Sequence, residues 1–218
     1  MTTLKELLDA RRARRAIELT AEENKVVERA VERLRVMQVA EQALQSGDSF
    51  PDFELADCEG RTSTLDSLLA SGPAVIVFFR GGWCPYCDLA LHAIDRIHSD
   101  LQALGASLVG IMPENRETLR QTCLSKKLSY PLLGDEGARI ARLCGLQFEM
   151  TDEHVALYER RGLDMSVRHA GSGWELPVPG AFVVAQDATV AMAFVDPDYT
   201  NRAEPLALVE AVRRLGGA

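Results

Sequence analysis

An apolar run that passes through two glycines into a pair of cysteines most constrains the fold of this chain. Residues 74–79, Ala-Val-Ile-Val-Phe-Phe, have the length and side chains of a buried strand. Arg80 and two glycines lead into Trp83-Cys84-Pro85-Tyr86-Cys87, after which a helical pattern runs from about 85 to 104. At a helix start, free N–H groups and the helix dipole favour a thiolate. The sequence therefore predicts a strand, a reactive dithiol and a helix in succession.

Composition excludes several other classes of protein. The 218 residues suffice for one well-buried domain with an extension. A formal charge of −8 argues against nucleic acid or an anionic membrane as the main partner. No apolar stretch approaches the ~20 residues that span a bilayer, and the N-terminus lacks a signal-peptide core. Five sparse cysteines do not form a secreted disulfide framework, so we expect a cytoplasmic protein.

Residues 1–47 are expected to form a helical extension of two helices. The first runs from Leu4 to Ile17, and Thr20 with Glu23 has the spacing of a capping box for the second. The second helix carries one apolar stripe, which must pack on the main domain or on a second subunit, so a homodimer through these helices is possible. The arginine cluster at 11, 12, 14 and 15 is interpreted as a solvated face.

Residues 48–218 are expected to form the main domain. Strands are predicted near 53–55, 74–79, 107–112 and 130–133, and helices at 115–126, 137–144, 151–161 and 204–215. Apolar strands that alternate with helices indicate a sheet covered on both faces and largely parallel in this half. Strands 181–184 and 190–194 are close enough to form an antiparallel hairpin, and 171–177 is read as a loop. The fold class is thus α/β, with a central mixed sheet flanked by helices.

Several segments together resemble the peroxiredoxin superfamily. They are Gly-Asp-x-x-Pro-Asp-Phe-x-Leu at 47–55, the strand and cysteine motif, Tyr-Pro-Leu-Leu-Gly-Asp at 130–135, and Phe-Val-Val at 182–184. More narrowly, they are similar to the alkyl hydroperoxide reductase/thiol-specific antioxidant (AhpC/TSA) proteins that carry a Cys-x-x-Cys, over residues 47 to 215. The resemblance implies a thioredoxin-like fold and reduction of hydroperoxides through Cys84 and Cys87. It also implies an external thiol reductant of the thioredoxin or glutathione type, and no cofactor.

The motif leaves open which cysteine attacks. Peroxiredoxins carry Pro-x-x-x-Thr-x-x-Cys, and if Cys87 takes the place of that cysteine, Arg80 replaces the proline and Cys84 the threonine. Trp83-Cys84-x-x-Cys87 instead matches thioredoxin, in which the first cysteine attacks, and the inner Pro-Tyr is that of glutaredoxins. Position at the helix start favours Cys84 as the more exposed thiol. The alternatives are therefore a protein or glutathione disulfide reductase, or a non-enzymatic redox sensor.

Arg80 and Pro179 are supporting candidates, together with Trp83. Arg80 either adds positive charge beside the thiols or is a surface arginine paired with a carboxylate. Pro179 precedes the strand at 181–184, where the resemblance implies a cis proline that faces the dithiol, with Pro177 as the competing choice.

The remaining cysteines and histidines are expected to be structural. A zinc site needs a second pair of ligands, but His92, His98, His154 and His169 are scattered, so no metal is expected. Cys58, Cys123 and Cys144 are interpreted as packing residues, with an additional resolving role open to Cys123. Trp174 and the segment 194–199 are candidates for shaping the substrate site or for ordinary loop packing.

Overall fold

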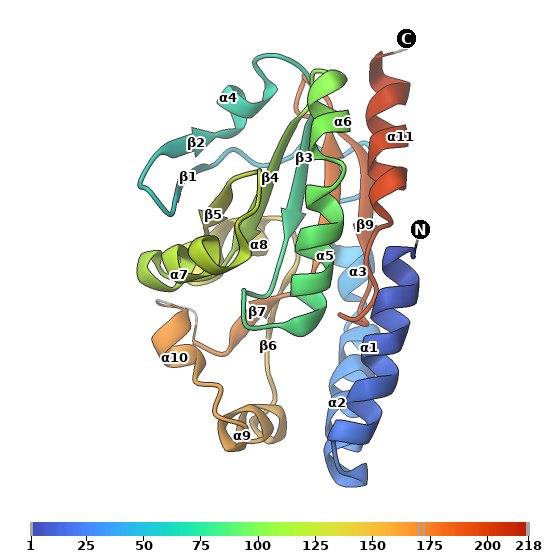
Figure 1. The fold of residues 1–218 in the computed structure, drawn as a ribbon, viewed down its shortest axis with the longest axis vertical. Coiled ribbons are helices and arrows are strands. Elements are labelled where there is room, and N and C mark those ends of the chain that lie inside the picture. Colours follow the sequence, from blue (N-terminus) through green and yellow to red (C-terminus); the bar gives the residue numbers. More distant parts are fainter. Residues whose placement is uncertain (1, 170, 172, 217–218) are drawn as a thin grey trace.

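The computed structural model describes residues 2–169, 171 and 173–216, and its centre is a seven-stranded mixed sheet (Figure 1). The strand order is β2-β1-β5-β4-β3-β8-β9, in which β3 pairs in parallel with β4 and β4 with β5, while the other pairs are antiparallel. The strands are β1 (Glu54–Asp57), β2 (Thr62–Thr64), β3 (Ala74–Phe78), β4 (Ser107–Met112), β5 (Leu132–Gly134), β8 (Gly180–Val184) and β9 (Val190–Val195). The predicted mixed sheet with a parallel half is confirmed.

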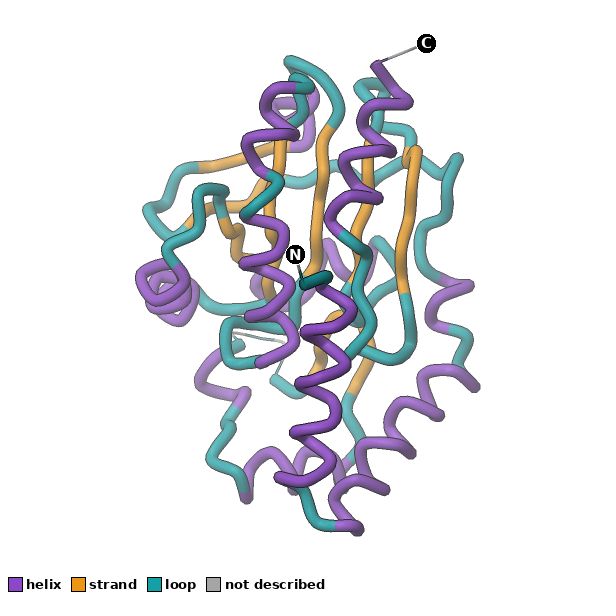
Figure 2. Tube along the Cα trace, turned by 45° about the vertical axis from the view of Figure 1, so that its right-hand side comes forward, coloured by secondary structure: helices purple, strands orange, loops and turns teal. Residues whose placement is uncertain are grey.

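Side chains of β3 divide the core into two layers. Val75, Val77 and Phe79 belong to one apolar cluster, whereas Ala74, Ile76 and Phe78 belong to another, because successive side chains of a strand point to opposite faces. Helices α5 (Pro85–Asp95), α6 (His98–Ala103) and α11 (Pro205–Gly216) cover the first face, and α4 (Leu65–Leu69) and α8 (Arg139–Leu143) the second (Figures 1 and 2). Helices α7 (Arg116–Lys126), α9 (Asp152–Arg160) and α10 (Met165–Arg168) and the 3-10 turn Glu136–Ala138 complete the domain.

The helix expected at 85–104 is two helices. The N–H group of Ile97 donates to the carbonyl of Ile94, three residues back, and this tight turn separates α5 from α6. Ile94, Ile97 and Leu101 all remain buried against the sheet. The sequence thus predicted correctly which residues face the sheet. The apolar spacing did not predict the turn that divides the segment into two helices.

The N-terminal extension packs on its own chain. It forms α1 (Leu4–Glu18), α2 (Ala21–Val36) and a short α3 (Val39–Gln42) that the sequence analysis missed, because Gln38 adopts a left-handed conformation between α2 and α3. The capping box of Thr20 and Glu23 is confirmed. Leu8 of α1 and Val27 of α2 are buried in the cluster that contains Cys84, so the apolar stripe is covered within the chain, while a dimer stays a prediction.

A second, two-stranded sheet lies outside the main one. Its strands are β6 (Gln147–Glu149) and β7 (Glu175–Pro177), which pair antiparallel. The prediction of a loop over 171–177 is therefore wrong at 175–177, because the partner strand is far away in sequence.

Among the described residues, each helix is too short or too polar to cross a membrane.

Candidate active site

Cys84 and Cys87 lie together where β3 gives way to α5. Cys84 is the N-cap residue of α5, Pro85 occupies the first helical position, and Cys87 follows within the first turn. The two preceding glycines are required sterically, since a methyl group at Gly81 would collide with Trp83 and one at Gly82 with Thr122. Both thiols are free and buried, with 1% of Cys84 and none of Cys87 exposed. Cys84 is the more accessible of the two only in that it lines a cavity that Cys87 does not reach, because the N-terminal helices cover this end of α5.

Hydrogen bonds and charge distinguish the two cysteines. Burial alone would raise the pKa of Cys84, but hydrogen bonding from Cys87 and the positive charges of Arg80 and Arg202 lower it to about 5. Burial and donation to Cys84 raise the pKa of Cys87 well above its usual value. Arg202 Nη2 lies 3.6 Å from Cys87 Sγ, which accepts from it. The arrangement holds Cys84 as the thiolate and Cys87 as the thiol.

Arg80 is the fixed cation of the site. Its side chain is fully buried, and its guanidinium lies 4.3 Å from the ring centre of Tyr199, 5.1 Å from Trp83 and 5.8 Å from Tyr158. Nη2 donates to the Tyr158 hydroxyl at 3.2 Å, but Nε and Nη1 have no hydrogen-bond partner among the residues that the structure describes. The alternative of a surface arginine paired with a carboxylate is wrong, and the thiolate of Cys84 supplies the opposing charge.

Two histidines line the aromatic side of Arg80 without adding charge. Burial and the nearby Arg80 lower the pKa of His154 to about 3 and that of His169 to about 4, so both rings are neutral at pH 7. The ring of His154 packs edge-on against Tyr158 with centroids 4.7 Å apart. Trp83 Nε1 donates to His169 Nε2 at 3.4 Å. Arg80 therefore remains the dominant charge beside Cys84.

A buried glutamate supports the loop before the dithiol. Glu114 Oε1 accepts from the Gly82 N–H at 2.8 Å, and Oε2 accepts from the Thr122 hydroxyl at 2.7 Å. Burial raises the pKa of this carboxyl above its usual value. The contact fixes the glycine loop against α7 and thereby orients Trp83 and Cys84.

A cavity of about 120 Å³ opens beside Cys84. Its walls combine apolar side chains with guanidinium groups, and they come from α1, α2, the CxxC segment, α9 and the loop at Tyr199 (Leu19, Val27, Trp83, Leu157, Leu163, Tyr199, with Arg11, Arg15, Arg80 and Arg161). Arg11 and Arg15 are half-buried here, and Arg12 donates to Thr200 and Asn201 in the loop that carries Tyr199. Only Arg14 of the cluster fits the predicted solvated face, since the other three pack around the site.

Pro179 lies buried at the start of β8. Because β8 runs antiparallel to β3, with Ala181 opposite Val77, this start lies at the end of the sheet that carries the cysteine motif. The predicted cis peptide bond is wrong, since all described peptide bonds, including Val178–Pro179, are trans. The Val178 N–H donates to Leu146 O, so β7 continues in extended form toward β8 and accommodates the commoner trans isomer.

Sequence reasoning missed most of the residues around the thiols. Tyr158 and His154 lie in the predicted helix 151–161, which carries no active-site motif, and Arg202 lies in a loop without one. Of the two candidates for shaping the substrate site, Tyr199 lines the cavity beside Cys84. Trp174 instead packs against Tyr158, with the ring centroids 6.4 Å apart. Among the described residues, no group of three or more His, Cys, Asp and Glu could hold a metal ion.

Comparison with known proteins identifies the family. The profile of the AhpC/TSA family matches residues 46–193. A peroxiredoxin-type protein of Mycobacterium tuberculosis is 28% identical over 104 residues, which cover 48% of this chain and 68% of that protein. Peroxiredoxin Q of the Sedum lineare chloroplast is 29% identical over 104 residues, covering 48% of this chain and 55% of that one.

Solved structures agree on the fold. Peroxidoxin BcpB from Mycobacterium tuberculosis superimposes with a TM-score of 0.61 and 21% identity, covering 79% of this chain and 98% of that one. Peroxiredoxin Q of Xanthomonas campestris gives a TM-score of 0.60 at 15% identity and covers 80% and 99%. The chain belongs to the AhpC/TSA family and is a peroxiredoxin-like, thiol-dependent peroxidase of thioredoxin fold.

Proposed function

We propose that the chain reduces hydroperoxides with Cys84 as the attacking thiolate and Cys87 as the resolving thiol. The observation that carries this assignment is the buried guanidinium of Arg80 beside Cys84, with two of its nitrogen atoms unpartnered. An unpaired buried charge is costly, so the site favours an anion at Cys84 before the peroxide arrives.

The reaction follows from this charge arrangement. The Cys84 thiolate attacks the terminal oxygen of ROOH, an S–O bond forms, the O–O bond breaks, and RO⁻ leaves and takes up a proton. The free N–H groups of Arg80 are suited to stabilise the negative charge that develops on the leaving oxygen. Cys87 then loses its proton and attacks the sulfur of the Cys84 sulfenic acid, and water leaves as the disulfide forms.

The cavity beside Cys84 supports a small substrate. Its volume of about 120 Å³ equals the space of only a few water molecules, and its apolar walls suit a short alkyl group. We propose hydrogen peroxide or a small alkyl hydroperoxide as substrate, and an external thiol of the glutathione or thioredoxin type as reductant. Five free cysteines support a reducing compartment such as the cytoplasm.

Trapping of the sulfenic acid tests the order of attack. In Cys87→Ser, one equivalent of peroxide should leave a sulfenic acid on Cys84 that a dimedone-type reagent captures in the tryptic peptide 81–96. Cys84→Ser should give no such adduct, since the thiol of Cys87 holds its proton. An adduct on Cys87 in Cys84→Ser, formed as fast as the first, would reverse the two roles.

We also propose that residues 1–47 form an extension to the main domain and that two copies of the chain form a homodimer through its helices. The exposed side chains of Ile17 and Val36 support a contact between copies, although the main stripe is covered within the chain. Light scattering of the full chain and of an Ile17→Glu/Val36→Glu variant tests it. A monomer mass for the full chain would exclude the dimer.

A further inference from the structure

A second pair of cysteines lies away from the active site. Cys58 is in the turn between β1 and β2, and Cys123 is in α7, 65 positions further along the chain. Both are half-buried and free. They line one cavity of about 520 Å³, which shares no lining residue with the cavity at Cys84.

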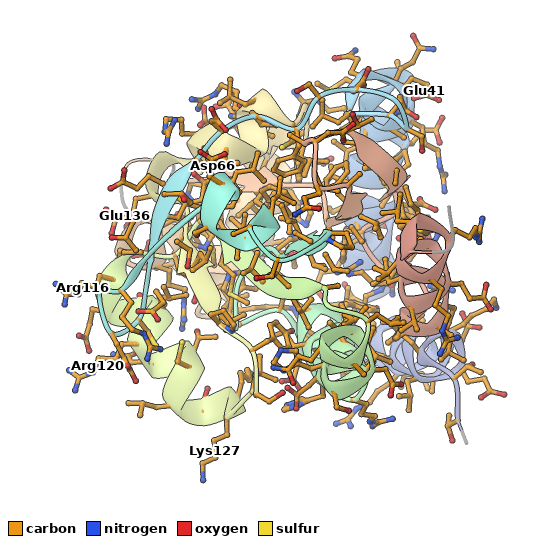
Figure 3. All side chains as sticks on the ribbon, turned by 90° about the horizontal axis from the view of Figure 1, so that it is seen from above. Glu41, Asp66, Arg116, Arg120, Lys127 and Glu136 are labelled. Carbon is orange, nitrogen blue, oxygen red and sulfur yellow. The ribbon has the colours of Figure 1, made fainter. Side chains whose placement is uncertain are left out.

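Packing of the turn on α7 brings the two thiols together. A methyl group added to Gly60 would lie 3.2 Å from Arg116 Nη2, so the turn rests against the first residue of α7. Cys123 comes seven residues after Arg116, two helical turns along the same face. Viewed from above, Arg116 lies beside the turn between β1 and β2 (Figure 3). The face of α7 that bears Arg116 and Cys123 therefore adjoins the turn that bears Cys58.

The two thiols share their surroundings, since Cys58 and Cys123 pack against the same buried apolar cluster and line the same cavity. Burial and a hydrogen bond to Cys58 raise the pKa of the Cys123 thiol, and the carboxylates of Asp57 and Glu114 raise it further. This influence of Cys58 on Cys123 agrees with the shared cavity, which places the two thiols near each other. Nearness of two thiols from separate elements is the first requirement of a disulfide, because the bond then needs little backbone movement.

We propose that Cys58 and Cys123 are a second redox dithiol, which a small disulfide entering the large cavity converts to a reversible Cys58–Cys123 disulfide. The cavity has the size of ordinary small-molecule sites, whereas the thiols at Cys84 and Cys87 are closed to solvent. The closed pair is suited to small peroxides, and the open pair to a bulkier disulfide.

The exchange balances in two steps. The Cys58 thiolate attacks one sulfur of RSSR, so that a mixed disulfide Cys58–S–S–R forms and RS⁻ leaves. Cys123 then loses its proton, its sulfur attacks the Cys58 sulfur, and the second RS⁻ leaves. The two cysteines lose two electrons, RSSR gains them, and the two protons end on the released thiols. An excess of RSH reverses both steps.

Peptide mapping of the native full chain tests the proposal, with oxidised glutathione as the probe. Acid quenching, alkylation and trypsin should yield peptide 36–61 linked to peptide 121–126, two hydrogen masses below their sum. Reduction with excess glutathione before quenching should remove the linked pair. Cys58→Ser and Cys123→Ser should each abolish it, whereas Cys144→Ser, at a buried cysteine outside the cavity, should retain it.

Three results would overturn the proposal. They are alkylation of both Cys58 and Cys123 after oxidation, glutathione adducts at these residues without a linked pair, or a link from 121–126 to the active-site peptide 81–96. Since the wild-type chain alone gives the deciding signal, a variant that fails to fold does not obscure it. The measurement does not use peroxide turnover, so its outcome is separate from that of the peroxidase proposal.

Discussion

The two thiol pairs lie in opposite electrostatic surroundings. Cys84 begins a helix, and the hydrogen bond from Cys87 together with the charges of Arg80 and Arg202 outweighs its burial and lowers its pKa to about 5. Cys123 lies in the eighth position of a helix, among carboxylates, and its pKa is raised. The same side chain thus favours the thiolate in one place and the protonated thiol in the other, because burial, hydrogen bonding and neighbouring charge differ.

The pair that contains the thiol with the lowered pKa is also the pair that is less accessible to solvent. Three elements distant in sequence, α1, α2 and α9, cover Cys84, whereas Cys58 and Cys123 are half-buried and line a larger cavity. Reactivity and exposure are therefore decoupled in this protein. A reactive thiolate that is shielded reacts with small substrates and is protected from bulky ones.

The largest expected effect is on peroxide consumption, and it should differ between variants of the two cysteine pairs. Cys84→Ser should reduce peroxide consumption by at least ~10³-fold, since the nucleophile is lost. The double variant Cys58→Ser/Cys123→Ser should keep the rate within about twofold. A coupled assay of peroxide turnover with an excess of thiol reductant measures both. Comparable losses in the two variants would mean that the second pair takes part in turnover.

Arg80→Met should lower kcat/KM for peroxide by ~10²-fold, because the thiolate and the leaving oxygen lose their buried cation. In the wild type, the rate should rise with pH through about 5 and level off above pH 6, since the thiolate fraction then saturates. In Arg80→Met the midpoint should move to higher pH, and thiolate absorbance should follow the same curve.

Arg14→Met is the matched control, since Arg14 is exposed on α1. It should leave the rate and its pH dependence unchanged. The Arg80 variant should fold, because Cys84 can take up a proton once the cation is removed, so that no unpaired charge stays buried. An unshifted midpoint in a folded Arg80→Met would refute the electrostatic account of Cys84.

Leu8→Ala tests whether the N-terminal helices shield Cys84 from solvent while leaving Cys58 unaffected. Leu8 is buried between α1 and the active-site layer, so its truncation should lower the free energy of unfolding by about 2–5 kcal/mol. Alkylation of Cys84 should become faster, while that of Cys58 stays the same. Leu124→Ala, at a side chain 67% exposed on α7, should change stability by less than about 0.5 kcal/mol.

The smallest expected effect concerns the neutral histidines. Burial lowers the pKa of His154 to about 3, so the unfolded chain binds a proton below about pH 6.5 that the folded chain does not. Stability should therefore fall as the pH drops from 7 to 5, and His154→Phe should remove about 2 kcal/mol of that loss. Denaturant unfolding at both pH values measures the difference, and an equal loss in the variant would show that His154 is already charged in the folded state.

The sequence by itself determined the strand–dithiol–helix segment and the fold class. An apolar strand, a glycine pair, a Cys-x-x-Cys and a helix are contiguous, so their order is encoded by short-range patterning, and Thr20 with Glu23 marked a helix start correctly. The apolar strands predicted the covered mixed sheet, because burial on two faces leaves continuous apolar runs.

Only the tertiary structure decided the surroundings of the thiols. Arg80 was named from the motif, but its burial depends on Tyr158 and Tyr199, which lie far from it in the sequence. The covering of Cys84 by the N-terminal helices, the trans peptide bond before Pro179 and the approach of Cys58 to Cys123 are all set by contacts between distant segments. Periodicity and spacing encode which face of an element is buried, whereas the partner across that face depends on how the whole chain packs.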